Sequence, residues 1–283
     1  VPIRYTSRKA EWQVDSDKLD VLFDQWFAAE PEEKLEAIKE RGVTLAALAK
    51  HSERVKLIAY DLWVHFKSWA MPDGFKAQVV AIDRQAIVLY KSALDTVIAD
   101  DLVKDGMDPA AAEAQAAAMS VCVYSPSQED DKPSEDPWVD GLRKDIKRFQ
   151  VTGQDERDVI NAFVNDPEGP KLLIVCSKLL TGFDAPVEAV MYLDSPLSEH
   201  NLLQAIARTN RVAGPKKQYG LIVDYIGVTK KLDEALASYR EADVQNAMVD
   251  LDVLRQELKA AHRDVTEFIK GISRAAEPTK DNL

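Results

Sequence analysis

Two arginines and a glutamine recur at helical spacing between residues 204 and 211. Gln204, Arg208 and Arg211 are spaced i, i+4 and i+7, which places them on one stripe of a helix. Arginine is always charged, and its planar guanidinium matches two phosphate oxygens at once. Arginines at this spacing usually belong to a solvated helix face. The neighbouring elements therefore decide whether this stripe is a phosphate site.

A turn with polar and conformationally free residues precedes that helix. Thr181, Gly182 and Asp184 follow residues 171–176, a continuous apolar run typical of a strand buried on both faces of a parallel sheet. Gly182 permits a positive φ or a close approach to a ligand, and its neighbours offer a hydroxyl and a carboxylate. A second such run covers residues 188–193. Because open α/β sheets bind ligands at the carboxyl ends of their strands, this context favours a phosphate site over a solvated face.

The charge of the chain is distributed unevenly. Its 36 Lys and Arg face 48 Asp and Glu, a net charge of −12. Residues 171–183 and 200–223 nevertheless carry lysines and arginines and no acid. The overall acidity argues against nonspecific nucleic-acid binding by the whole surface, but the two basic stretches predict anion binding at the expected ligand edge.

The alternation of apolar runs predicts three regions. Residues 1–70 are expected to form a helical lead-in, residues 71–228 an α/β domain, and residues 229–283 the start of a C-terminal helical region. The α/β domain is expected to alternate strands with helices, which implies a parallel sheet with right-handed crossovers. Its strands are predicted near 78–82, 120–124, 172–176, 189–193 and 219–225, and its helices at 84–102 and 109–118.

The segment 125–140 interrupts this pattern with prolines and six acidic residues against Lys132 alone. Such a composition favours a mobile, solvated loop. The alternative is an acidic contact, within residues 129–140, for the basic surface of a partner.

The sequence Thr181-Gly-Phe-Asp-Ala-Pro186 and the pattern QxxxRxNR at 204–211 resemble motifs V and VI of superfamily 2 helicases. Their form is similar to that of the R (restriction and translocation) subunit of type I restriction enzymes. Residues 77–84 resemble the motif IV strand, although Asp83 stands where serine is more usual, and residues 220–227 resemble the strand after motif VI. Motif VI is shared by many helicases and indicates only the superfamily. The sequence Thr181-Gly-Phe-Asp-Ala-Pro186, together with Asn-Arg at the end of motif VI, narrows the resemblance to the R subunit. The resemblance covers about residues 70–230.

This resemblance implies an α/β fold of the RecA-like type, a parallel β-sheet with flanking helices, with N-terminal and C-terminal helical segments added. The chain would supply the second RecA-like lobe of an ATP-dependent DNA translocase. In that family, ATP binds between two such lobes. The roles implied are arginine fingers for Arg208 and Arg211 with help from Gln204, coupling of nucleotide to DNA for Gly182 and Asp184, and DNA phosphate contacts for Arg84, Lys178 and Thr181.

Motifs expected of the first lobe are absent from this sequence. No Gly-Lys dipeptide occurs, so there is no G-x-x-x-x-G-K-[ST] phosphate loop, and no acidic box for Mg²⁺ follows. The chain also begins at Val1. We therefore expect a fragment of a type I site-specific deoxyribonuclease, one that needs ATP and Mg²⁺ in the full-length parent and is inactive alone. The pattern Pro72-Asp73 with 145–147 resembles a nuclease signature, but it falls in a loop and a helix, so no nuclease residues are assigned.

The resemblance also implies partners. These are double-stranded DNA, the first RecA-like lobe, and the modification (M) and specificity (S) subunits. No apolar run approaches the ~20 residues that cross a bilayer, so no membrane is expected, and two cysteines within apolar runs favour a reducing cytoplasm. Two alternatives stay open: the lobe of another superfamily 2 helicase, or a non-catalytic RecA-like interaction module, against which the arginine stripe argues.

Overall fold

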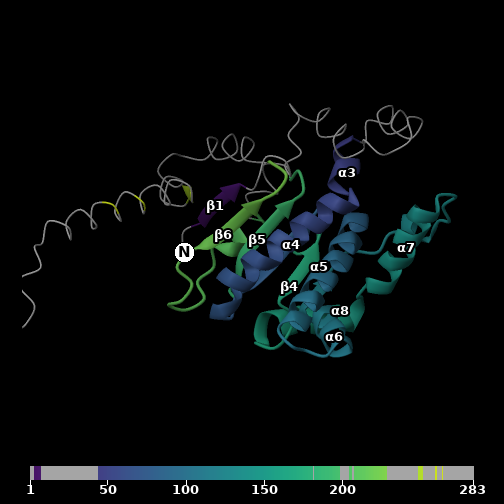
Figure 1. Cartoon of the computed structure of the whole chain (residues 1–283). Coiled ribbons are helices and arrows are strands. Elements are labelled where there is room, and N and C mark those ends of the chain that lie inside the picture. Colours follow the sequence, from purple (N-terminus) through teal and green to yellow (C-terminus); the bar gives the residue numbers. More distant parts are fainter. Residues whose placement is uncertain are drawn as a thin grey trace, which may run out of the picture.

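The computed structural model describes residues 3–7, 44–180, 182–197, 204–205, 207–227 and 248–250, together with Lys259 and Arg263. Its centre is a seven-stranded sheet in which every described pair of strands is parallel (Figure 1). In sheet order the strands are β3 (Ser120–Cys122), β4 (Leu172–Val175), β2 (Lys76–Ala81), β5 (Glu188–Asp194), β6 (Gly220–Asp224), β1 (Ile3–Ser7) and β7 (Met248–Asp250). The predicted RecA-like parallel sheet is confirmed, and all five predicted strands are present.

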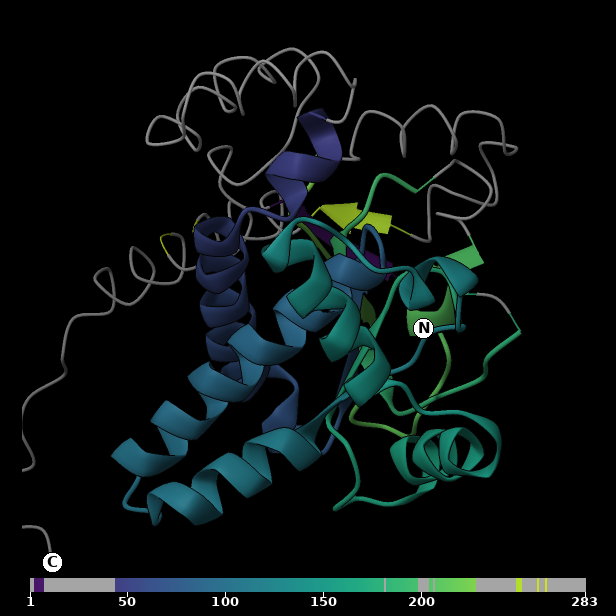
Figure 2. The same cartoon turned by 90° about the vertical axis from the view of Figure 1, so that its right-hand side faces the viewer.

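Helices cover both faces of the sheet (Figure 2). One face packs against α4 (Ser52–Trp69), α5 (Arg84–Lys104), α6 (Pro109–Met119) and α7 (Pro137–Phe149), and the other against α8 (Gly153–Asn165) and the turn after β4. Strands β2, β4, β5 and β6 are buried along their whole length, as expected for parallel strands covered on both sides. Two helices, α5 and α6, agree with the predicted ranges 84–102 and 109–118.

The N-terminal region differs from the predicted helical lead-in. Residues 3–7 form strand β1, which pairs with β6 and β7 inside the sheet. The short segment alternates apolar and polar residues, and its partners lie far away in the sequence, so a local pattern could not reveal it. The helices that follow, α3 (Thr44–Ala49) and α4, pack on the sheet rather than preceding it. The predicted helical C-terminal region lies almost wholly outside the described residues, and the division into three domains stays a prediction.

Most described residues of the acidic segment 125–140 are exposed, as expected, but parts of the segment are helical. Residues Gln128–Asp131 form a short 3-10 helix, η3, and α7 begins at Pro137. The Asp136 side chain accepts a hydrogen bond from the backbone of Trp138 and so caps α7. Two aspartates of η3 form ion pairs with basic residues of α5 and α7, which the composition alone did not predict.

None of the helices in the described part of the chain is long and apolar enough to span a bilayer.

Candidate functional site at the turn after strand β4

The turn after β4 is held in a conformation that few residues adopt. Leu179 has φ 66° and Gly182 has φ 69°, so two left-handed residues occur within four positions. A positive φ is uncommon for leucine and easy for glycine. An added Cβ on Gly182 would meet nothing within 4 Å, so the backbone conformation, not space, requires glycine there. Thr181, the predicted phosphate contact in this turn, lies outside the described residues.

Arg208 connects a short helix to this turn. The described residues of this helix, the arginine helix, are 204–205 and 207–209. Arg208 Nη1 donates a hydrogen bond of 2.5 Å to the carbonyl oxygen of Phe183, and its Nε lies 3.4 Å from that of Leu180. The side chain is half-buried. The two segments that resemble motifs V and VI are therefore in direct contact, although the contact employs some of the donors that the sequence assigned to a phosphate.

Arg211 is placed differently from Arg208, because the helix ends at Thr209 and Arg211 follows in a bend, so the predicted helical stripe does not include it. Arg211 Nε lies 3.3 Å from Oδ1 of Asp184, and the two side chains are 53% and 66% exposed. Ion pairs between exposed groups contribute little because water screens them. The Arg211 guanidinium is therefore available to a stronger anion.

Gln204 is half-buried on the arginine helix. Its apolar neighbours in the sequence, Leu202, Leu203 and Ile206, lie outside the described residues. Ala205 and Thr209 are fully buried there, so this helix does pack against the domain.

Lys217 holds the far end of the same turn. It is 3% exposed, and its Nζ donates hydrogen bonds of 2.7 and 2.6 Å to the carbonyl oxygens of Pro186 and Glu188. Burial lowers the pKa of Lys217 to about 8, while the nearby Glu188 opposes that shift. Together, Arg208 and Lys217 contact four backbone carbonyls of residues 180–188.

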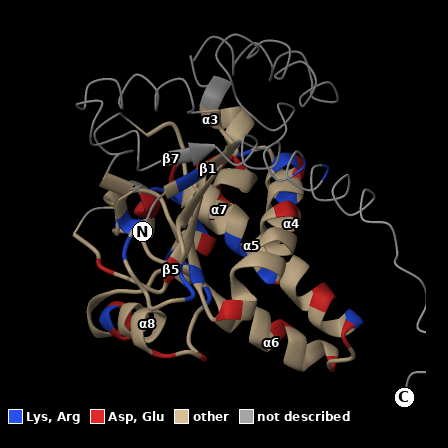
Figure 3. Cartoon of the chain, turned by 90° about the vertical axis from the view of Figure 1, so that its left-hand side faces the viewer, with Lys and Arg blue, Asp and Glu red and all other residues tan. Residues whose placement is uncertain are grey.

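The basic stretch 200–223 thus does not gather at one ligand edge, which corrects the prediction from charge. The Lys217 ammonium donates its hydrogen bonds to backbone carbonyls. Lys216 precedes β6, and its Nζ lies 3.6 Å from Asp73 Oδ1. Among the described basic residues of this stretch, Arg208 and Arg211 contact residues 180–184 of the turn. Over the described elements, charges of both signs are interspersed along the helices (Figure 3).

Glu188 is a buried carboxyl group beneath the turn. It is fully buried, and neither carboxylate oxygen has a hydrogen-bond partner among the described residues. Burial raises its pKa to about 8, against the opposing positive charges of Lys217 and Arg208. A carboxyl group in such surroundings favours its neutral form.

The two other predicted phosphate contacts follow neighbouring strands. Arg84 begins α5 just after β2, and Lys178 follows β4, which pairs with β2. Arg84 Nε lies 2.9 Å from Asp130 Oδ2, and Lys178 Nζ lies 2.6 Å from Glu156 Oε2. Both cations therefore carry an internal carboxylate partner that the sequence analysis did not predict.

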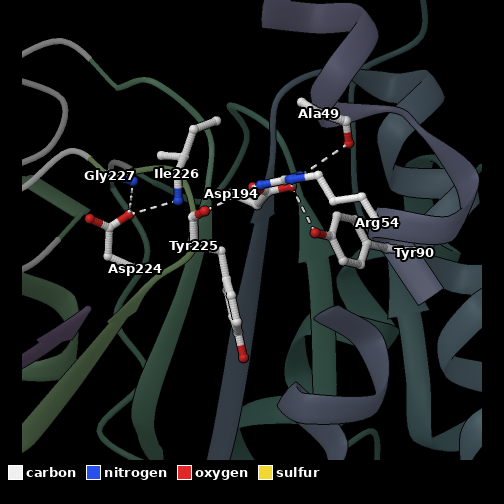
Figure 4. A network of polar contacts seen from close by, with 8 residues as sticks. All are labelled: Ala49, Arg54, Tyr90, Asp194, Asp224, Tyr225, Ile226 and Gly227. Atoms are coloured by element: carbon white, nitrogen blue, oxygen red, sulfur yellow. Dashed lines mark hydrogen bonds and ion pairs between the residues drawn. The ribbon is translucent and has the colours of Figure 1, made fainter. Parts of the chain in front are cut away.

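The sequence analysis also did not predict the buried ion pair between Arg54 and Asp194 at the end of β5 (Figure 4). Arg54 of α4 donates two hydrogen bonds to the carboxylate of Asp194 and a third to the carbonyl of Tyr225, which follows β6. A signal existed: Arg54 stands four residues before Ile58, on the stripe that carries the apolar side chains of α4. Nearby, the Asp224 carboxylate accepts hydrogen bonds from the backbone N–H groups of Ile226 and Gly227. These contacts fix the ends of β5 and β6.

A parallel sheet covered by helices on both faces, with an arginine helix hydrogen-bonded to the segment between β4 and β5, defines a RecA-like α/β domain. The family model for type I restriction enzyme subunit R domain 3 matches residues 141–227. This range includes the turn after β4, the arginine helix and β6.

Curated relatives carry the same description. The chain is 30% identical over 276 residues to the type I restriction enzyme HindI endonuclease subunit of Haemophilus influenzae, covering 95% of this chain and 23% of that protein. It is 38% identical over 206 residues to the MjaVIIP endonuclease subunit of Methanocaldococcus jannaschii, covering 70% of this chain and 18% of that protein. The chain belongs to the family of type I restriction enzyme R subunits, and it spans about a fifth of the length of these relatives.

A solved structure of a variant of S. cerevisiae Dbp5 with bound RNA and ADP BeF3 matches more weakly. It shares 12% identity at a TM-score of 0.29, over 68% of this chain and 45% of its own. This likeness is too low to establish a shared geometry.

Proposed function

We propose that this chain is one RecA-like half of an ATP-driven DNA translocase, the motor of a type I restriction endonuclease. The observation that supports it most strongly is the hydrogen bonding of Arg208 to the turn after β4. A motor needs such a connection between its nucleotide-binding and DNA-binding segments, because its affinity for DNA has to change with the state of the bound nucleotide. ATP would bind between this domain and a second RecA-like domain, the first lobe of the motor.

Arg211 is the residue that we assign to the γ-phosphate of ATP. Its ion pair with Asp184 joins two exposed side chains, so a phosphate oxygen can replace the carboxylate at little cost. The planar guanidinium would then stabilise the negative charge that develops during phosphoryl transfer. Mg²⁺ bound with the nucleotide would neutralise further phosphate charge.

The remaining residues of the turn and helix would transmit the nucleotide state. Arg208 would hold the turn through its two carbonyl contacts and keep its other N–H donors for the nucleotide. Gln204 would position the arginines or the attacking water. Gly182 and Asp184 would move with the turn when Arg211 exchanges its partner, which couples the nucleotide cleft to the DNA side.

Double-stranded DNA is the proposed track, and Arg84, Lys178 and Thr181 are the proposed contacts to phosphates of one strand. The first two follow neighbouring strands of the sheet, which suits successive phosphates. Such contacts carry no sequence information, as translocation along any sequence requires. Site recognition would belong to the S subunit and modification to the M subunit.

The test is ATP hydrolysis by the R subunit that contains this chain, with Arg211→Ala and Lys216→Ala compared. Both side chains are more than half exposed, and Lys216 lies near Asp73, just before β6. Loss of an arginine finger lowers the rate by roughly 10³-fold or more, so we expect Arg211→Ala to lose turnover while its melting temperature stays unchanged. Lys216→Ala is expected to change neither quantity.

Normal turnover in Arg211→Ala, or a fall in melting temperature together with lost activity, would contradict the assignment. The chain alone is expected to hydrolyse no ATP, because we assign the phosphate loop to the other lobe.

A further inference from the structure

A hollow of about 410 Å³ opens at the carboxyl ends of β2 and β4. Its lining combines both strand ends with η3 and α7. The residues that matter for binding are two arginines, Arg84 and Arg143, a serine hydroxyl, Ser177, and two aspartates, Asp83 and Asp130. Arg143 comes from α7, an element to which the sequence assigned no function.

The positive charges of the hollow exceed its unpaired negative ones. Asp83 is already neutralised by Lys50, 2.9 Å away, and its other oxygen accepts a hydrogen bond from the backbone of Ala86, which caps α5. Asp130 alone is left opposite Arg84 and Arg143. The two arginines therefore carry one more positive charge than Asp130 balances.

Asp130 lies in η3, a short segment that is bonded to α7 and places this carboxylate beside Arg84. Its side chain is 12% exposed and its Oδ2 lies 2.9 Å from Arg84 Nε. The segment is tied to α7 by an ion pair between Asp131 and Lys147 at 2.9 Å. It is tied again by a 2.5 Å hydrogen bond that Arg143 Nη1 donates to the carbonyl oxygen of Lys132. A carboxylate held this way occupies the position that a phosphate would take beside Arg84.

We propose that Arg143 forms, with Arg84, a second phosphate position of the DNA track, and that the Asp130 carboxylate holds this position until a DNA phosphate displaces it. The proposal rests on the proposed function, which makes Arg84 a DNA contact. A guanidinium has five N–H donors, and one hydrogen bond to Lys132 leaves Arg143 with donors for a phosphate. Ser177 supplies a hydroxyl on the β4 side of the hollow.

The experiment measures binding of the R subunit to fluorescent duplexes of unrelated sequence, over a range of salt concentrations. Arg143→Gln should weaken binding equally for all sequences and flatten the slope of log K against log salt by about 0.9, the value for one phosphate contact. Its matched control is Lys144→Gln, the next residue of α7, which is exposed and paired with Asp140. The control should leave both quantities unchanged.

The role of Asp130 is tested with Asp130→Asn against Glu135→Gln. Both remove one negative charge from the same segment, and Glu135 is exposed. Removing a competing ion pair of this strength should tighten DNA binding roughly two- to fivefold, whereas Glu135→Gln should not. Weaker binding by Asp130→Asn would mean that Asp130 positions Arg84 for DNA, and it would overturn the displacement.

Two further variants separate this proposal from the proposed function. If Arg84→Gln and Lys178→Gln leave DNA binding unchanged, the DNA track itself is wrong. If they weaken binding while Arg143→Gln behaves like Lys144→Gln, only the second phosphate position is wrong. If Arg143→Gln weakens binding of an ATP analogue and leaves DNA binding intact, the hollow holds a nucleotide phosphate and the proposal fails.

Discussion

Arg54 and Asp194 form a buried bidentate ion pair between helix α4 and the end of strand β5, with N–O distances of 2.8 and 2.5 Å. Both side chains are at most 2% exposed. The Tyr90 hydroxyl donates a further 2.7 Å hydrogen bond to the same carboxylate, and burial raises the pKa of Tyr90 well above its ordinary range. Because Asp194 is the last residue of β5, this pair fixes where the chain leaves the sheet toward the arginine helix.

Removing Arg54 should destabilise the domain strongly. Arg54→Met leaves the Asp194 carboxylate buried without its counter-ion, which costs about 3–5 kcal/mol. Denaturant unfolding measures this loss. Lys56→Met in the same helix is the control, since Lys56 and Glu53 form an exposed pair and should change stability by less than ~0.5 kcal/mol.

A second substitution tests the cause of that loss. Adding Asp194→Asn to Arg54→Met removes the unpaired charge and should restore part of the stability. If the double variant is no more stable than Arg54→Met, lost packing rather than buried charge is responsible.

Glu188 should make stability depend on pH. Burial raises the pKa of Glu188 from 4.5 to about 8, so between these values the folded chain holds a proton that the unfolded chain releases. Stability therefore falls as pH rises through this window, by at most about 1.4 kcal/mol per pH unit from this group. Glu188→Gln mimics the protonated form and should flatten the fall.

The measurement is denaturant unfolding at several values between pH 5 and pH 8, compared with exposed Glu135→Gln. Identical pH profiles for wild type and Glu188→Gln would show that the carboxyl group is ionised in the folded state.

The central strands could be predicted from sequence because each is a continuous apolar run. Strand β1 could not, because Ile3, Tyr5 and their polar neighbours form a sheet only by pairing with β6, which lies more than 200 residues later. The two arginines were assigned the same role, yet one donates to backbone carbonyls and the other is exposed. Helical spacing predicted one stripe for both arginines, but the helix ends at Thr209, before Arg211. Where a helix ends, and which segment packs against it, decide which atoms each side chain contacts.

The acidic partners were missed for the same reason. Arg84 and Lys178 carry positive charge in the sequence, and nothing local indicates that Asp130 and Glu156 neutralise them. These ion pairs depend on where η3 and α8 pack in the fold. A count of charges along the chain does not contain that information.

Two glycines should respond in opposite directions to alanine. A Cβ on Gly220, at the start of β6, would lie 2.4 Å from the carbonyl oxygen of Thr209 in the arginine helix, so Gly220→Ala forces that helix away. Overpacking of this kind costs about 1–3 kcal/mol. A Cβ on Gly141, inside α7, meets nothing within 4 Å, so Gly141→Ala should stabilise the chain by about 0.5–1 kcal/mol.

Thermal melting and denaturant unfolding of both alanine variants check this contrast. A Gly220→Ala variant as stable as wild type would mean that the arginine helix can shift without loss, and that its contact with β6 is not tight.

Arg208 should differ from Arg211 in what its loss does to the fold. Its two hydrogen bonds join the arginine helix to the carbonyls of Leu180 and Phe183, and bonds from a charged donor contribute roughly 1.5–3 kcal/mol. Arg208→Ala is therefore expected to lower both melting temperature and ATP hydrolysis, whereas Arg211→Ala lowers hydrolysis alone. Arg208→Lys should recover little, because two different nitrogens of the planar guanidinium make the two carbonyl contacts, whereas an ammonium has one nitrogen. Melting curves and ATPase rates of the three variants decide the matter, and an Arg208→Ala variant of unchanged stability would show that these two hydrogen bonds do not hold the turn.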